Sequence, residues 1–262
     1  MSKLDAAQVV KRARRADKIT AQELITHLFP DFFELHGDRV GGDDPAIIGG
    51  WATFHDQPVT VIITNRGQDL AERQQTHFGS PMPAGYRKAL RLMQQAAHFN
   101  RPVLVFVNTP GAYPSPEAEE QGQGPALAQS ILAMGELEIP VITVIYGEGG
   151  SGGALALAVS DQVWMLEYST YAILSPEGFA AILWKDSKKA DEAARVMKIT
   201  ARDLLELGII EKVIPEDIPA SRGNENAICR MLRAQICSFL VQYQQMGAEE
   251  LANHRYQRFR KM

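Results

Sequence analysis

Cysteine is almost absent from this sequence, which carries only Cys229 and Cys237 among 262 residues. Both fall within the stretch 227–245, whose amphipathic pattern predicts a single helix. Two cysteines on one helix supply neither a disulfide framework nor a cysteine-based zinc ribbon, so both classes are excluded. The low cysteine content is typical of a reducing compartment, and we predict a cytoplasmic protein.

Long apolar runs are missing as well. The longest stretches, such as 154–159, fall far short of the roughly 20 residues that a membrane helix needs, and residues 1–5 show no signal segment. Positive charge is not in excess either, because 27 Lys and Arg stand against 31 Asp and Glu. We therefore expect neither a membrane nor nucleic acid as a partner.

Alternating strand and helix signals fill the middle of the chain, and 45% hydrophobic residues supply a sizeable core. A strand, a turn and a helix follow one another repeatedly, which predicts a single α/β domain. Strands are predicted at 46–54, 59–63, 103–107, 141–146, 162–166, 171–174 and 209–214. Helices are predicted at 21–29, 85–99, 125–135, 178–184, 190–197, 200–207 and 227–245. The basic run at 11–18 is interpreted as a solvated helix face, with a partner-facing patch as the alternative.

A glycine-rich turn, 147–153, follows the strand predicted at 141–146 and fits two unrelated motifs. Gly147-x-Gly149-x-x-Gly152 fits a dinucleotide fingerprint, but that motif opens the first strand–helix unit of its fold, and here several units precede it. Gly149-x-Ser151-x-Gly153 fits a nucleophile elbow with Ser151 as nucleophile. The only downstream histidine, His254, lies in what reads as a charged tail. A P-loop is excluded because no Lys-Ser/Thr pair follows the glycines.

Gly152 and Gly153 carry a physical signal that is independent of these motifs. They stand just before a helix expected from Ala154, so their N–H groups would lack partners and face outward. Such donors form an oxyanion hole, in which one N–H contributes about 2.7–4 kcal/mol to a transition state. This interpretation allows a positive φ at either glycine. The alternative, a turn whose glycines serve only close packing, stays open.

Several motifs together resemble one known family. They are Glu34-Leu35-x-Gly37-Asp38-Arg39, Asp43-Asp44-x-Ala46-Ile47, Phe78-Gly79-x-Pro81-x-Pro83-x-Gly85-Tyr86-Arg87-Lys88-Ala89-Leu90-Arg91-Leu92-Met93, Thr109-Pro110-Gly111-Ala112-Tyr113-Pro114, the run 147–156, and Tyr168-Ser169-Thr170-Tyr171 with Ser175-Pro176-Glu177-Gly178 and Leu183-Trp184-Lys185. The combination, which spans about residues 24–216, is similar to the α subunit of bacterial acetyl-CoA carboxylase carboxyltransferase.

The resemblance implies a crotonase-like fold of stacked ββα units with helical N- and C-terminal extensions. The expected segments are an N-terminal extension (1–40), a carboxyltransferase core (41–216) and a C-terminal helical segment (217–262). It also implies transfer of a carboxyl group from carboxybiotin, on the biotin carboxyl carrier protein, to acetyl-CoA, giving malonyl-CoA for fatty acid synthesis. Gly152 and Gly153 would be the catalytic N–H donors to the biotin ureido oxygen. Substrate binding is expected at Gly111, Ala112, Tyr113, Gly149 and Gly150.

The same resemblance implies partners and cofactors. An α2β2 assembly is expected, in which the active site lies between the two kinds of subunit and the β subunit carries a zinc ribbon. Biotin carboxylase, which uses ATP, would complete the holo-complex. This chain itself is expected to bind no metal and no resident cofactor.

The chain departs from the family pattern at three places. Thr64-Asn65-Arg66-Gly67-Gln68 replaces a His-Gln-Lys-Gly-Arg run, and the run 115–122 lacks an arginine that the family commonly has. The chain is also expected to begin some sixty residues into longer family members. These departures concern ion pairs and assembly contacts.

Two rival interpretations remain. A stand-alone hydratase of the same fold would need a glutamate two residues after the paired glycines, where Leu155 stands, so Glu177 is interpreted as a helix cap. A non-catalytic subunit that only scaffolds its partner is the second rival. The segment 86–91 is interpreted either as a phosphate or partner surface or as a solvated helix face. His36, His77 and His98 show no spacing that predicts a metal site.

Overall fold

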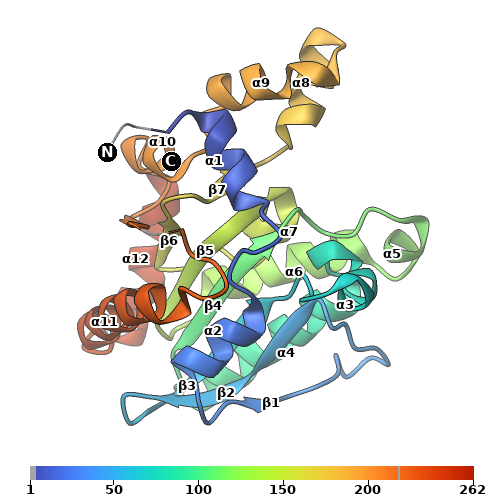
Figure 1. The fold of residues 1–262 in the computed structure, drawn as a ribbon. Helices are drawn as coiled ribbons and strands as arrows, with labels where there is room; N and C mark the ends of the chain where they lie inside the picture. The colour runs from blue at the N-terminus through green and yellow to red at the C-terminus, as the bar shows by residue number, and fades with distance from the viewer. Residues whose placement is uncertain (1–3, 218) are drawn as a thin grey trace.

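A computed structural model describes residues 4–217 and 219–262 of the chain. Its centre is one twisted sheet with the strand order β1-β2-β3-β4-β5-β6-β8, and β7 pairs with the far end of β5 (Figure 1). The hairpin β2–β3 and the short β1 are antiparallel, whereas β3, β4, β5, β6 and β8 run parallel. The strands are β1 (Phe33–Glu34), β2 (Ile47–Phe54), β3 (Gln57–Thr64), β4 (Val103–Thr109), β5 (Val141–Gly150), β6 (Gln162–Leu166), β7 (Thr170–Ala172) and β8 (Lys212–Ile214).

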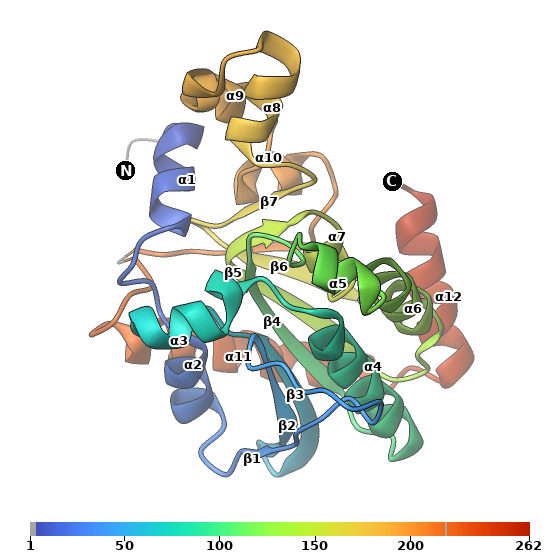
Figure 2. The same ribbon diagram turned by 90° about the vertical axis from the view of Figure 1, so that its right-hand side faces the viewer.

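Helices join the parallel strands and cover both faces of the sheet (Figure 2). They are α1 (Ala6–Ala13), α2 (Ala21–Leu28), α3 (Leu70–Gln75), α4 (Pro83–His98), α5 (Pro116–Glu120), α6 (Gln123–Glu136), α7 (Ser151–Leu155), α8 (Pro176–Trp184), α9 (Ala190–Val196), α10 (Ala201–Glu206), α11 (Glu225–Tyr243) and α12 (Ala248–Arg260). The predicted strands and helices are therefore confirmed, although several boundaries shift and the last strand is shorter. The capping box at the start of α2 is present, since Thr20 and Glu23 exchange side chain–backbone hydrogen bonds.

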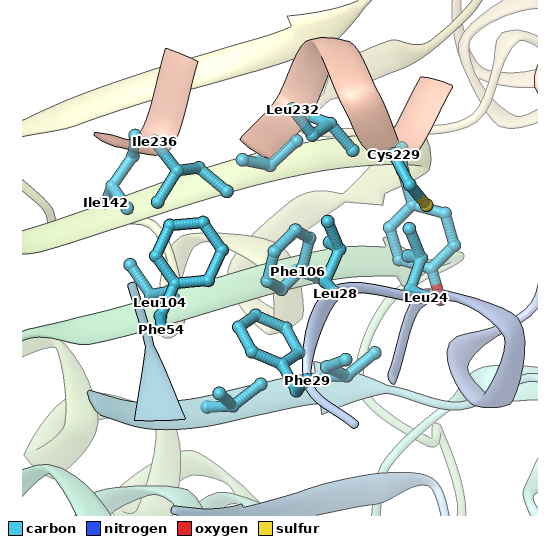
Figure 3. Packing of buried hydrophobic residues seen from close by; sticks show 14 of the residues in the cluster. Leu24, Leu28, Phe29, Phe54, Leu104, Phe106, Ile142, Cys229, Leu232 and Ile236 are labelled. Atoms are coloured by element: carbon cyan, nitrogen blue, oxygen red, sulfur yellow. The ribbon is translucent and has the colours of Figure 1, made fainter. Parts of the chain in front are cut away.

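The two faces of the sheet support two separate hydrophobic cores. Helices α2 and α11 pack on one face, where Phe29, Phe54 and Phe106 meet Leu232 and other residues of α11 (Figure 3). Helices α4 and α6 pack on the other face with α7. Because side chains alternate across a strand, the fully buried strands β4 and β5 contribute to both cores. Strands β4 and β5 are therefore packed on both faces.

A pair of helices, α8 and α9, stands out from the body of the molecule at the top of Figures 1 and 2, with α1 beside it. We call residues 173–198 the arm. Its apolar side chains are unusually exposed: Ile173 is 88% exposed, and Ile182 and Leu183 are each 59% exposed. Within the described residues, no helix is both long and apolar enough to cross a membrane.

The residues around His254, interpreted from the sequence as a charged tail, are helical and partly buried. The charged tail around His254 forms α12, and its Arg255 is only 1% exposed. The Arg255 guanidinium donates hydrogen bonds to the carbonyls of Met134, Leu137 and Ile139 and to the Asp161 carboxylate. A buried arginine that satisfies so many acceptors ties the last helix to the body.

Candidate functional site

The glycine-rich turn lies where β5 ends and α7 begins. Strand β5 continues through Gly150, since Gly149 pairs with Thr109 of β4 and with Tyr171 of β7. The chain changes direction between β5 and α7 at Ser151, whose φ is 45°. Helix α7 therefore starts three residues earlier than expected, and Gly152 and Gly153 lie inside its first turn. The sequence interpretation allowed a positive φ at either glycine, but neither adopts one.

Close packing explains some of these glycines. A Cβ added to Gly150 would come within 2.0 Å of the Pro110 carbonyl oxygen, and one added to Gly153 within 2.4 Å of the Ala112 nitrogen. At Gly149 the added carbon would lie 2.9 Å from the Tyr171 ring. Gly150 and Gly153 exclude side chains because the backbone of the loop after β4 approaches them directly, and Gly149 excludes them because side chains of Tyr171 and Ile145 pack against it.

Gly152 is different, because the nearest atom to an added Cβ is the Leu127 Cδ1, 3.8 Å away. Packing therefore does not require a glycine there. The N–H groups of Gly152 and Gly153 belong to the first turn of α7, where no intrahelical acceptor is available. Among the hydrogen bonds of the described residues, none uses either group as a donor. The turn thus carries two N–H groups without a hydrogen-bond partner, of which that of Gly152 belongs to a half-buried residue and that of Gly153 to a buried one.

Two cavities meet at this turn, and Ser151 lines both. The first, of about 320 Å³, is lined by Gly111, Ala112, Gly149 and Gly150, four of the five residues expected to bind substrate. The second, of about 560 Å³, lies on the Gly152 side. Its walls are mostly apolar side chains from several elements, among them Leu155, Tyr171, Ile173, Phe179, Leu204, Leu207, Ile209 and Phe259.

Tyr113, the fifth expected residue, is not among the residues that line either cavity. Its ring lies 4.1 Å from the ring of His77, measured between centroids, and its N–H donates to the Pro81 carbonyl. The structure therefore places Tyr113 outside both cavities, in contact with the segment that leads into α4.

Sequence reasoning missed Glu148, the residue that precedes Gly149. Glu148 is only 9% exposed and lies at the first cavity, where its carboxylate contacts Arg14 and Arg66. An acidic residue within a buried strand requires cationic partners. The presence of a glutamate at the end of the apolar strand was therefore a signal that the sequence offered. The basic run was correspondingly misinterpreted as a merely solvated face, since Arg14 reaches this site and Lys18, 7% exposed, pairs with Glu216.

The rival motifs lack their structural context. Ser151 has no histidine near it in either cavity lining, as far as the described residues extend, so a Ser–His arrangement is not formed. The dinucleotide pattern fails because Gly147 and Gly149 belong to strand β5 and do not form a phosphate loop. Glu177 was expected to cap α8, but it does not. Ser175 is the N-cap, and its side chain accepts a hydrogen bond from the Gly178 N–H.

The segment at the start of α4 is structural. Lys88 is 1% exposed, and its Nζ lies 2.5 Å from Asp43 Oδ1 and 2.9 Å from the Asp44 carbonyl. Arg87 pairs with Asp38 at 2.7 Å. These cations are committed to carboxylates of the same chain, so neither a phosphate surface nor a solvated face describes them. Across residues 4–217 and 219–262, no group of three or more His, Cys, Asp or Glu side chains is arranged to hold a metal ion.

Comparison with solved structures identifies the fold. A transcarboxylase 12S structure with methylmalonyl-coenzyme A bound superimposes with a TM-score of 0.72 at 19% identity, covering 91% of this chain and 44% of that one. A Pseudomonas malonate decarboxylase hetero-tetramer in complex with coenzyme A gives a TM-score of 0.69 at 16% identity, covering 90% and 92%. The expected crotonase-like fold is confirmed.

Comparison with sequences identifies the family. The family described as "Acetyl co-enzyme A carboxylase carboxyltransferase-like" matches residues 1–262. The acetyl-coenzyme A carboxylase carboxyl transferase subunit alpha of Streptococcus equi subsp. zooepidemicus is 52% identical over 258 residues, which is 98% of this chain and 99% of that protein. The subunit of the same name from Streptococcus thermophilus is 51% identical over the same length. The resemblance seen in the motifs is thus confirmed, and the chain belongs to the alpha-subunit family of the acetyl-CoA carboxylase carboxyltransferases.

Proposed function

We propose that this chain supplies the carboxybiotin half of a two-subunit carboxyltransferase, which moves a carboxyl group from carboxybiotin to acetyl-CoA and forms malonyl-CoA. The single observation that carries this proposal is the pair of unused N–H groups at Gly152 and Gly153, beside a position where no packing atom demands a glycine. The names of the Streptococcus relatives support acetyl-coenzyme A as the substrate and carboxyl transfer as the reaction.

The chemistry follows from where charge develops. When the carboxyl group leaves the biotin nitrogen, negative charge grows on the ureido oxygen of the biotin ring. Two fixed N–H dipoles at the start of α7 stabilise that charge without reorganising, which is how a preformed oxyanion hole lowers a barrier. In this proposal the substrate is held by the walls of the first cavity, which are formed by Gly111, Ala112, Gly149 and Gly150. Tyr113 supports the Gly111–Ala112 loop through its contacts with His77 and Pro81.

A β subunit completes the site in this proposal. The apolar cavity beside Gly152 is bordered by exposed side chains, with Ile173 88% exposed and Leu207 61% exposed, and such a surface is typical of a protein contact. The superimposed transcarboxylase chain is more than twice the length that this chain covers, which supports a second half contributed by another polypeptide. Zinc is assigned to that β subunit, and the carrier protein and biotin carboxylase act with the pair.

The test begins with co-expression of the chain and its β subunit, followed by an assay of malonyl-CoA-dependent carboxylation of biocytin. We expect activity from the complex and none from the isolated chain. Robust turnover by the pure single chain would overturn the two-subunit proposal.

A matched pair of glycine variants then tests the N–H donors. Gly152 is the second residue of α7 and Gly124 is the second residue of α6, and neither meets crowding at an added Cβ. We expect Gly152→Val to lower carboxyl transfer by about 10²-fold or more, the scale of losing one oxyanion donor, because the valine side chain would fill the open space beside the N–H groups and keep the ureido oxygen away from them. Gly124→Val should leave carboxyl transfer unchanged. Full activity of Gly152→Val in an assembled complex would favour the rival of a scaffold without chemistry.

A further inference from the structure

Arg14 connects two carboxylates that come from distant parts of the chain. Its Nε donates to Glu148 Oε1 at 2.6 Å, and its Nη1 and Nη2 donate to the two oxygens of Glu177 at 2.7 and 3.3 Å. Arginine is suited to this role because its planar fork serves two acceptors at once. The residue itself stands at the C-terminal end of α1, which lies next to the arm in Figures 1 and 2.

Glu148, the first of the two carboxylates, fixes the end of β5. Its Oε2 accepts a hydrogen bond from Arg66 Nη1 at 2.8 Å, and its backbone N–H donates to Asn108 Oδ1 at 3.0 Å. The side chain is 12% exposed, so the carboxylate depends on these partners rather than on water. Because Gly149 follows directly, any shift of Glu148 moves the strand end on which α7 is mounted.

Glu177, the second carboxylate, lies at the base of the arm as the second residue of α8. The hydrogen bond from Arg14 lowers the pKa of Glu177, so that its side chain is an anion near neutral pH. Burial alone would lower the pKa of Arg14, but the hydrogen bond to Glu177 and the charge of Glu148 outweigh burial and raise it. Arg14 therefore stays charged, and both of its partners stay bound.

The rest of α1 is fastened to the arm. Val10 is buried against Ala194 and Ile199, and Lys11 Nζ lies 2.9 Å from the Asp191 carboxylate. Asp5, just before α1, pairs with Arg195 of α9 at 2.8 Å. Helix α1 thus holds the arm along its length and ends with Arg14 at the strand that carries the glycine-rich turn.

We propose that Arg14 is a positioning residue for carboxyl transfer: by bridging Glu148 and Glu177 it sets the glycine-rich turn and the arm in one fixed relation. This rests on the proposed function, because the turn must be the site of the transfer. The arm and the turn together line both cavities, so their relation decides the shape of the space that substrate enters.

Arg14→Gln tests this in the assembled complex, with Arg15→Gln as the matched control. Arg15 is the next residue, and within the described part of the chain its side chain pairs with Asp17 on the surface and with no other carboxylate, so it shares the charge but not the bridge. We expect Arg14→Gln to lower kcat about 10- to 100-fold with little change in KM, the signature of lost positioning in the transition state. Arg14→Lys should recover part of kcat, because an ammonium can pair with one carboxylate but cannot form the bridge. Arg15→Gln should retain the kcat of the unaltered complex.

Hydrogen exchange on the isolated full chain provides a readout that does not need activity. Arg14→Gln should speed amide exchange in residues 173–198 and at the end of β5, and Arg15→Gln should not. Unchanged exchange would overturn the bridge, and faster exchange with an unchanged kcat would overturn its role in transfer. An unaltered complex that transfers no carboxyl group would instead refute the proposed function, while the exchange result would still show whether Arg14 joins the arm to the turn.

Discussion

The backbone of Gly153 packs so closely on that of Ala112 that a Cβ on the glycine would lie 2.4 Å from the Ala112 nitrogen. The same added carbon would lie 2.5 Å from the hydroxyl oxygen of Tyr86, a residue with no exposed surface. The contact joins α7, the loop after β4 and helix α4. It also separates the two neighbouring glycines by role, since Gly152 has no comparable contact.

This contact predicts opposite effects of alanine at the two glycines. We expect Gly153→Ala to lower the free energy of unfolding by about 1–3 kcal/mol or more, because the clashing atoms include backbone and cannot move aside. Gly152→Ala should leave the protein as stable or raise the free energy of unfolding by about 0.5–1 kcal/mol, since alanine favours a helix over glycine. Urea denaturation of the isolated chain measures both. A Gly153→Ala variant as stable as the unaltered chain would contradict the packing described here.

Ser151 provides a separate prediction about activity. Ser151→Ala removes the hydroxyl but retains the backbone turn, so we expect the assembled complex to lose less than about tenfold in turnover, whereas loss of a true serine nucleophile costs on the order of 10⁶. Ser151→Gly should be slightly more stable, because glycine adopts φ 45° without the strain of a side chain. If Ser151→Ala abolished transfer while Gly152→Val did not, a hydrolase-type turn would be the better account.

The Lys88–Asp43 pair predicts acid sensitivity. Burial alone would raise the pKa of Asp43, but the hydrogen bond and charge of Lys88 lower it from 3.8 to about 2. Because the folded pKa lies below the unfolded one, ionised Asp43 stabilises the fold above about pH 4, and this contribution is lost as the pH falls from about 4 to about 2. The stability gap between the unaltered chain and Asp43→Asn should therefore shrink over that window. Urea midpoints at several pH values measure the gap, and Asp56→Asn in the exposed hairpin turn is the control.

Arg255 provides the largest expected loss of stability. Arg255→Met leaves the fully buried Asp161 carboxylate without its cation and three carbonyls without their donor, so we expect a loss of about 3–5 kcal/mol in the free energy of unfolding. Arg260→Met, at the exposed end of the same helix, is the matched control. A loss below about 1 kcal/mol at Arg255 would show that α12 is held by other contacts.

Elements with a strong local signal were predictable from the sequence. The strands predicted at 46–54 and 59–63 depend on neighbouring residues, and so does the strand–glycine–helix pattern around Gly152. The family motifs identified the fold because they cover most of the chain.

Features that depend on distant partners were not predictable. The buried state of Arg255 is set by carbonyls more than 100 residues away, and the role of Arg14 by carboxylates 134 and 163 residues away. A run of arginines and lysines shows that charge is present but not which charges find partners. The assignment of Gly153 to packing likewise required the position of the Ala112 backbone, which no local pattern contains.

The burial of Arg255 also bears on the order in which the chain can finish folding as it is made. Asp161 and Arg255 are separated by 94 positions, so synthesis at about 5–20 residues per second puts about 5–20 s between them. During that interval the nascent sheet has its Asp161 carboxylate and the carbonyls after α6 without their final donor. Completion of the domain must therefore wait for the last helix. A chain released before residue 255 is made would lack the donor for the Asp161 carboxylate and for the carbonyls after α6.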